Sequence, residues 1–204
     1  PLPRFYQFTS EIVAIGASPH GNTVATLEFP DKIEIRQKRS HLRIDPPSNS
    51  FQSFLLWPEQ HSRGGELSGD MREWGRPLLQ HEPGRASSIR IVNISGGGIR
   101  FEFHLASLQT KERPQFRLGD HFFVSLDLYD PEDEESARLI LHAKVRNAFE
   151  DHAAKRIEIG LEFLGQGHKT LDRPDFVVWQ RLPEDTGVER IDNWVFKRHL
   201  ELHR

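Results

Sequence analysis

Residues 88–104 read SIRIVNISGGGIRFEFH, two segments of regular pattern joined by three glycines. In each segment apolar and polar side chains alternate, which is typical of a strand with one buried and one exposed face. A short glycine-rich connection commonly joins two antiparallel neighbours. The stretch therefore predicts a β-hairpin with strands at 88–94 and 98–104.

The same alternation recurs through the C-terminal half of the chain, at 122–128, 139–147 and 157–163. Turn-like or charged residues separate these segments. Short strands at such intervals favour an antiparallel barrel or sandwich over a parallel α/β fold. With the strand expected at 51–57, we predict an all-β fold, a six-stranded antiparallel barrel.

The last segment has a different period. Between residues 187 and 202, apolar side chains that include Val188, Ile191 and Val195 recur at helical spacing. This pattern predicts a C-terminal amphipathic α-helix laid on the barrel.

Two further regions complete the expected organisation. Residues 1–36 contain too few strands to hold a core alone, so this segment either pairs with the rest of the chain or is the tail of an upstream β domain. The chain opens on Pro1 rather than Met, which suggests a fragment of something longer. The main domain is expected to span 37–204. Within it, residues 58–87 are polar and rich in glycine and proline, which predicts a long surface insertion with one helical turn near 71–74.

The composition narrows the function. The 204 residues carry 27 Lys and Arg against 30 Asp and Glu, a net charge of -3, so nothing draws the whole chain to a nucleic acid polymer or an anionic membrane. The absence of cysteine excludes disulfides, thiolate metal sites and thiol nucleophiles. No apolar run approaches the roughly 18 residues that span a bilayer. We expect a cytoplasmic protein without membrane insertion.

Positive charge is concentrated locally, at the entrance to the main domain. The segment 36–43 supplies five donor side chains, Arg36, Gln37, Lys38, Arg39 and Arg43. The arginine fork bonds phosphate oxygens in pairs, grips guanine O6 and N7, and stacks on bases. If Arg39 lies in a linker and Arg43 starts a strand, the two can close on a ligand from two sides. Taken alone, such a run is more typical of a solvated linker.

The turn of the 88–104 hairpin offers complementary groups. Asn93 can accept hydrogen bonds from a guanine edge, and Ser95 places a hydroxyl where a phosphate can accept from it. Gly97 and Gly98, with the glycine before them, permit positive φ and close backbone approach, so their N–H groups can form an anion-binding concavity. Taken alone, three glycines also make an ordinary hairpin connection.

In this order and between strands, the two segments resemble the PilZ domain, a bacterial receptor for cyclic di-guanosine monophosphate (c-di-GMP). Residues 39–43 match its RxxxR motif, residues 93–98 match its D/NxSxxG motif, and residues 160–163 resemble its late Gly-x-x-Phe strand. The resemblance implies that the principal ligand contacts come from Arg39, Arg43, Asn93, Ser95 and Gly98. The neighbouring candidates are Arg36, Gln37, Lys38, Gly97 and Gly160.

The resemblance also implies a function. The chain is expected to be a non-enzymatic second-messenger receptor with no cofactor, in which c-di-GMP reorients two domains and a protein partner reads the change, with an output such as motility or biofilm formation. Residues 1–36 would be the end of the small barrel that precedes PilZ in flagellar-brake-type proteins. Lys38 stands where the family often has arginine, and the insertion is longer than the usual link between the motifs.

The sequence also allows other functions, most of which are disfavoured. Because Lys38 and the insertion depart from the family, a degenerate scaffold module that does not bind the nucleotide is the main alternative. A single-strand RNA binder is disfavoured by the net charge and by the lack of an aromatic surface pattern. We expect no catalytic residue, since Ser95 lacks the glycine two positions before it that a serine elbow needs. We also expect no metal site, since His199 and His203 lack a third ligand.

Overall fold

The computed structural model of the chain describes residues 5–36, 40–47, 50–82, 89–109, 115–130 and 135–202. The chain divides into two compact units, Pro1–Ser40 and His41–Arg204. None of the helices in the described residues is long and apolar enough to cross a membrane.

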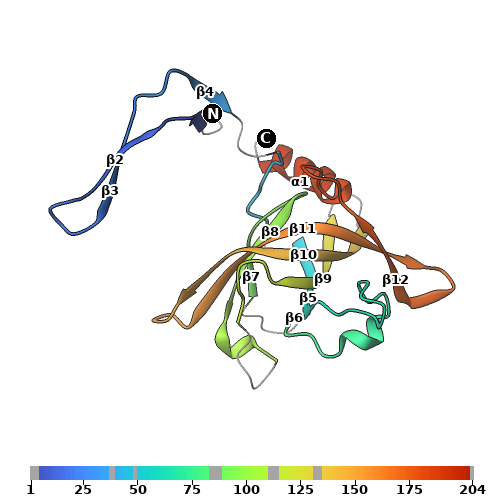
Figure 1. The fold of residues 1–204 in the computed structure, drawn as a ribbon. Helices are drawn as coiled ribbons and strands as arrows, with labels where there is room; N and C mark the ends of the chain where they lie inside the picture. Colours follow the sequence, from blue (N-terminus) through green and yellow to red (C-terminus); the bar gives the residue numbers. More distant parts are fainter. Residues whose placement is uncertain are drawn as a thin grey trace. The chain divides into compact units, whose positions relative to one another are not determined.

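The N-terminal unit consists of two separate antiparallel strand pairs (Figure 1). Strand β1 (Phe5–Phe8) pairs with β4 (Ile33–Arg36), and β2 (Ile12–Ala17) pairs with β3 (Thr23–Leu27). Every residue of β2 and β3 is exposed, apolar ones included. Two-stranded ribbons enclose no interior. The identity of this unit as a barrel remnant stays a prediction.

The second unit is built on one curled antiparallel sheet (Figure 1). Its eight strands are β5 (Phe51–Pro58), β6 (Leu79–His81), β7 (Ile89–Ser95), β8 (Gly98–His104), β9 (His121–Asp130), β10 (Glu135–Asp151), β11 (Arg156–Thr170) and β12 (Arg173–Arg181). Their hydrogen-bonded order is β6-β5-β9-β10-β11-β8-β7, and β12 also pairs with β11. The all-β, antiparallel class is confirmed. The sheet has two strands more than the six expected, because β6 comes from the insertion and β12 from residues beyond the last alternating segment.

The inner face of the sheet and the C-terminal helix share one core. Phe54, Phe101 and Leu126 are among its fully buried side chains. Helix α1 (Glu189–Leu202) adds Ile191 and Val195, both fully buried. The amphipathic helix predicted at 187–202 is therefore present, two residues shorter at its start.

A second, smaller core lies on the outer face of β5, β9 and β10. It consists of Trp57, Trp74, Phe123, Ile140 and Val177. Trp57 and Phe123 are cross-strand partners, so their side chains share one face of the sheet.

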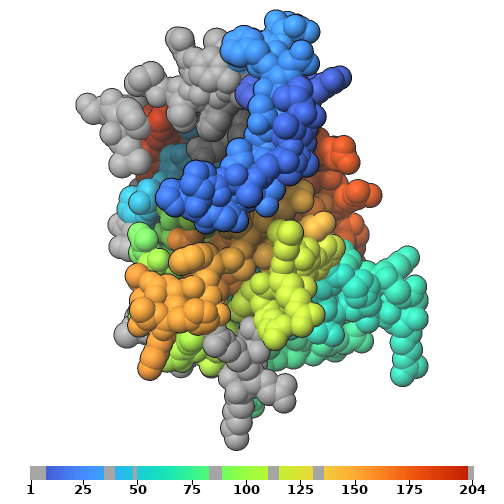
Figure 2. Space-filling model, turned by 60° about the vertical axis from the view of Figure 1, so that its left-hand side comes forward, coloured from blue at the N-terminus to red at the C-terminus, as the bar shows by residue number. Residues whose placement is uncertain are grey.

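The segment that follows β5 covers this face, and here the prediction of a surface insertion was wrong. The 3₁₀ helix η2 (Met71–Trp74) occupies the place of the predicted helical turn, but its Trp74 is only 3% exposed and Leu79 of β6 is fully buried. The tip of the segment is a surface loop: residues 61–66 are exposed, and this part projects in Figure 2 (teal). The many glycines and prolines of the segment predicted a loop, although a few apolar side chains within it are spaced to cover a neighbouring sheet.

Candidate ligand-binding site

The hairpin predicted at 88–104 is present as β7 and β8, with Ser95 paired to Gly98 across the turn. The glycines of this turn have no positive φ, unlike Gly21 or Gly119. They are needed for close approach instead. A Cβ on Gly98 would collide with the carbonyl oxygen of Leu161 on β11, and one on Gly97 would lie 2.7 Å from Cδ2 of His41.

A row of polar and glycine residues crosses the outer face of four strands. Asn93 of β7 lies opposite Arg100 of β8, Arg100 opposite Gly160 of β11, and Gly160 opposite Asn147 of β10. Residues directly opposite in a sheet present their side chains on the same face. A Cβ on Gly160 would lie 2.5 Å from Oδ1 of Asn147, so glycine there makes room for that amide.

The Asn93 side chain is placed for recognition of an external group. A bulge interrupts the pairing between Ile91 and Asn93, and bulges commonly re-aim a side chain. Asn93 is half-buried, and within the described residues its amide has no hydrogen-bond partner. It can therefore offer both an acceptor and two donors to a ligand.

The entrance segment joins this face through an isolated bridge between Ile44 and Ile94. Their backbones exchange two hydrogen bonds, with N···O distances of 3.1 Å and 3.0 Å. Because the bridge is antiparallel, the exposed Arg43 is brought opposite Ser95 on the outer face. Ser95 itself is 3% exposed, and its hydroxyl donates to the carbonyl oxygen of Gly98 at 3.4 Å.

The anion-binding turn predicted from the glycines is occupied by a side chain of the protein. The N–H of Gly96 donates to Oδ1 of Asp192 at 2.9 Å, and the other carboxylate oxygen lies 3.0 Å from Nδ1 of His41. The N–H of Val188, just before α1, donates to the carbonyl oxygen of Gly96 at 2.8 Å. The turn, the entrance segment and the start of the helix are thus held together by one carboxylate.

Sequence reasoning missed four residues of this site, Arg100, Asn147, His41 and Asp192. Arg100 could have been found, because its place in the alternating 98–104 segment puts it on the same face as the motif. His41 and Asp192 could not, because they are 151 positions apart and an acidic residue in the first helical turn is common for reasons of helix stability alone.

Ion pairs flank the row on the same outer face. Arg90 Nε lies 2.8 Å from Glu102, Arg100 pairs with Glu158, and Arg146 Nε lies 2.6 Å from Glu162. The hydrogen bonds that Arg90 and Arg146 donate to the carboxylates of Glu102 and Glu162 raise the pKa of both arginines. All three arginine side chains are about half-exposed, and Arg100 is the one that lies in the row, so a phosphate bound there can compete for it.

The structure brings together six of the ten candidate residues, Arg43, Asn93, Ser95, Gly97, Gly98 and Gly160, within the second unit. Arg36 ends β4 in the N-terminal unit. Gln37, Lys38 and Arg39 lie outside the described residues. The role of all ten in binding stays a prediction.

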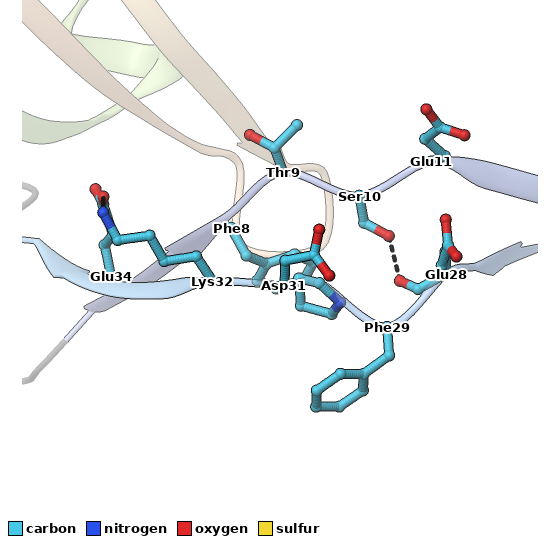
Figure 3. A pocket seen from close by; sticks show the side chains of 10 residues that line it. Phe8, Thr9, Ser10, Glu11, Glu28, Phe29, Asp31, Lys32 and Glu34 are labelled. Carbon is cyan, nitrogen blue, oxygen red and sulfur yellow. Dashed lines mark hydrogen bonds and ion pairs between the residues drawn. The ribbon is translucent and has the colours of Figure 1, made fainter.

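A hollow in the N-terminal unit has the opposite electrostatic character (Figure 3). It lies between the 8–11 and 28–34 segments and is lined by Glu11, Glu28, Asp31 and Glu34 among others. Its one lysine, Lys32, is paired with Glu34 at 2.7 Å. Such a lining repels phosphates, so this hollow does not suit an anionic ligand.

Comparison with known proteins agrees with this fold. A family model described as PilZ domain matches residues 61–173, which includes the hairpin and Gly160 but not the 36–43 segment. No curated protein matches the chain. The inhibitor of motility MotI (DgrA) of Bacillus subtilis superimposes with a TM-score of 0.52 at 18% identity, covering 98% of this chain and 69% of that one.

Two further solved structures are more distant. The MrkH–c-di-GMP complex of K. pneumoniae gives a TM-score of 0.41 at 14% identity and covers 98% of this chain and 68% of that chain. The PilZ domain of YcgR from Escherichia coli with c-di-GMP gives 0.37 at 12% identity and covers 81% and 95%. At these identities the likeness to MotI concerns the fold alone.

Proposed function

Because the chain belongs to the PilZ domain family, whose model matches more than half of its residues, we propose that it is a receptor for c-di-GMP. PilZ domains are in general non-enzymatic receptors of this dinucleotide. The ligand would bind to the outer face of β7, β8 and β11 and to the basic segment 36–43.

The observation that carries this proposal is the row Asn93, Arg100, Gly160 with Arg43 beside Ser95. Within the part of the chain that the structure describes, the Asn93 amide has no hydrogen-bond partner and can face a guanine edge. Arg43 and Arg100 carry the planar forks that bind phosphate or stack on a base. Gly160 makes room for the Asn147 amide at the end of the row, so a base that reaches Gly160 would lie against that amide.

The basic segment gives the receptor a way to signal. Arg36 belongs to one unit and Arg43 to the other, and Lys38 and Arg39 come between them in the sequence. A ligand that holds cations on both sides of this connection would favour some arrangements of the two units over others. A cytoplasmic protein partner that reads the favoured arrangement belongs to the same proposal.

One observation favours the alternative of a scaffold module that binds no nucleotide. The N–H of Gly96 is bonded to Asp192 and Arg100 is paired with Glu158, so part of the anion-binding capacity is already used. A ligand would have to displace the second of these contacts.

Titration calorimetry with c-di-GMP separates the two functions. The parent protein should bind, and the double variant Arg39→Ala/Arg43→Ala should bind at least about 100-fold more weakly, because each charge-assisted bond to a phosphate contributes roughly 1.5–3 kcal/mol. The matched control Arg63→Ala/Arg76→Ala removes two exposed arginines outside the row and should leave the affinity unchanged. No binding by the parent would refute the receptor function, and full binding by the double variant would refute the site.

A further inference from the structure

Three side chains that the proposed receptor function does not use meet at the edge of the second core. Glu59 directly follows β5, His121 is the first residue of β9, and His142 lies in the middle of β10. The backbone N–H of Glu59 donates to the carbonyl oxygen of His121 at 3.1 Å, which fixes the start of the covering segment against β9. His142 is opposite Phe123, two residues along from His121, so both imidazoles project from the outer face.

The contacts converge on one carboxylate. Oε2 of Glu59 lies 2.7 Å from Nδ1 of His121 and 2.7 Å from Nε2 of His142. These three ligand atoms all lie within 4.8 Å of one another. A third imidazole, that of His61, places Nε2 2.8 Å from Oε1 of the same carboxylate.

The cluster is closed at its base and open at its mouth. The side chains of His142 and Glu59 are 10% and 13% exposed, those of His121 and His61 33% and 50%. The base is rigid, because the His142 ring packs against the rings of Phe123 and Trp179 at 6.0 Å and 6.1 Å between centroids. Trp179 is itself fixed by a hydrogen bond of 3.1 Å to the carbonyl oxygen of Ser68.

The donor set suits metal ligation. The cluster offers one carboxylate and the imidazole nitrogens of His121 and His142, and their ligand atoms lie within 4.8 Å of one another. Carboxylates and imidazole nitrogens bind metal ions in their deprotonated forms.

We propose that Glu59, His121 and His142 bind a divalent transition-metal ion, Zn²⁺ foremost, and that His61 supplies the fourth ligand at the mouth. Imidazole and carboxylate are donors that zinc prefers, and it takes four of them. With zinc–ligand distances of about 2.0–2.2 Å, neighbouring ligand atoms in a tetrahedral site are about 3.3 Å apart. The observed hydrogen-bond distances of 2.7 Å reach that value if the side chains separate by less than an ångström.

The bound ion would have a structural effect. It would tie the covering segment, through Glu59 and His61, to β9 and β10, and so hold the second core in place. The sequence analysis predicted no metal site, because the ligands of this one are separated by up to 83 positions and the histidines with a metal-like spacing are those of the C-terminal tail.

The experiment uses the full chain with His199→Gln and His203→Gln, so that the tail cannot bind metal; His203 lies outside the described residues. After treatment with a chelator and dialysis, Zn²⁺ is titrated in competition with a chromophoric chelator. One Zn²⁺ should bind per chain, and at a free concentration 100-fold above the dissociation constant the melting temperature should rise by about 5 °C or more. Co²⁺ in its place should give the visible absorption of a four-coordinate ion.

Single variants then assign the ligands. His121→Gln and Glu59→Gln should each weaken Zn²⁺ binding at least about 100-fold, and His61→Gln about 10-fold, since it removes only the exposed ligand. The control His152→Gln removes an 82% exposed histidine that pairs with Glu150 at 2.9 Å, away from the cluster, and it should leave Zn²⁺ binding unchanged.

Two results would overturn the site: no saturable Zn²⁺ binding by the protein without tail histidines, or parent-like binding by both His121→Gln and His61→Gln. The exposed His61 serves as the second test in case His121→Gln does not fold. Titration of the same variants with c-di-GMP is independent of these outcomes, so the metal site and the receptor function succeed or fail separately.

Discussion

The outer face of one sheet is used in two different ways. Over β7, β8 and β11 it is open, and its side chains are arginines, glutamates, Asn93 and glycine. Over β5, β9 and β10 it carries Trp57, Phe123 and Ile140 and is covered by η2 and part of β12. The first region has the groups to bind a charged ligand, and the second has the groups to bury a second core.

The difference comes from which side chains face outward. Ion pairs between half-exposed groups contribute little stability and can be exchanged for a ligand's phosphates. Each aromatic ring left in water, by contrast, costs about 25 cal/mol per Å² of apolar surface, so the aromatic region requires a cover. A variant that affects one region should therefore leave the other unchanged.

Removal of the central cover residue should give the largest effect. Trp74 is 3% exposed and its ring lies 4.5 Å from that of Phe123 and 5.5 Å from that of Trp57, between centroids. Trp74→Ala should lower the free energy of unfolding of the second unit by about 3–5 kcal/mol, because it leaves a cavity between aromatic rings. Urea denaturation monitored by circular dichroism measures this.

The comparison requires two controls for that variant. Phe149→Ala truncates an aromatic residue that is 68% exposed and should change the free energy of unfolding by about 0.5 kcal/mol or less. The folded fraction of Trp74→Ala should bind c-di-GMP as the parent does. A loss of affinity without loss of fold would show that the covered region takes part in binding.

A smaller effect is expected for the open region, in affinity rather than stability. Arg100→Gln removes the arginine between Asn93 and Gly160 and should weaken c-di-GMP binding about 10-fold, the loss of one charge-assisted hydrogen bond. Its ion pair with Glu158 is half-exposed, so the free energy of unfolding should change by less than about 1 kcal/mol. Calorimetric titration and urea denaturation measure the two quantities.

Arg90→Gln is the matched control for Arg100→Gln. Arg90 makes the same kind of pair, with Glu102 at 2.8 Å, on the same face but outside the row. It should leave the affinity unchanged. Equal losses in the two variants would mean that the ligand responds to the charge of the face and not to the row.

Local patterns predicted the open region well. The alternation and glycines of 88–104 gave the hairpin, and the face on which Arg100 lies follows from the same alternation. The local pattern did not predict two long-range contacts: the bridge between Ile44 and Ile94, and the hydrogen bond from Gly96 to the carboxylate of Asp192. Such contacts depend on where the helix and the entrance segment are placed in space, which no local signal specifies.

The covered region also has a signal in the sequence. Residues 122–124 and 139–141 are continuous apolar runs, which indicate strands buried on both faces rather than one. The outer face of these strands therefore requires a cover. Apolar side chains that can supply it, such as Leu67, Met71 and Trp74, lie in the segment predicted to be a surface loop. The polar composition of this segment is typical of its exposed tip at 61–66 and not of the part that packs on the sheet.

The smallest effect concerns how the cover is held at low pH. Asp70 caps η2, and the side-chain hydrogen bond from Arg72 lowers the pKa of Asp70 from 3.8 to about 2. Because the folded pKa is below the unfolded one, the stabilisation is present above pH 3.8 and is lost as the pH falls towards 2. In Arg72→Gln the pKa of Asp70 should return towards 3.8, and the stability of the protein should depend less on pH across that interval. Nuclear magnetic resonance of the Asp70 carboxyl carbon follows this directly, with Arg63→Gln, on the exposed tip, as the unchanged control. An Asp70 that already titrates near its ordinary value in the parent would mean that the pair is open in solution, and that the aromatic side chains alone hold the cover on the sheet.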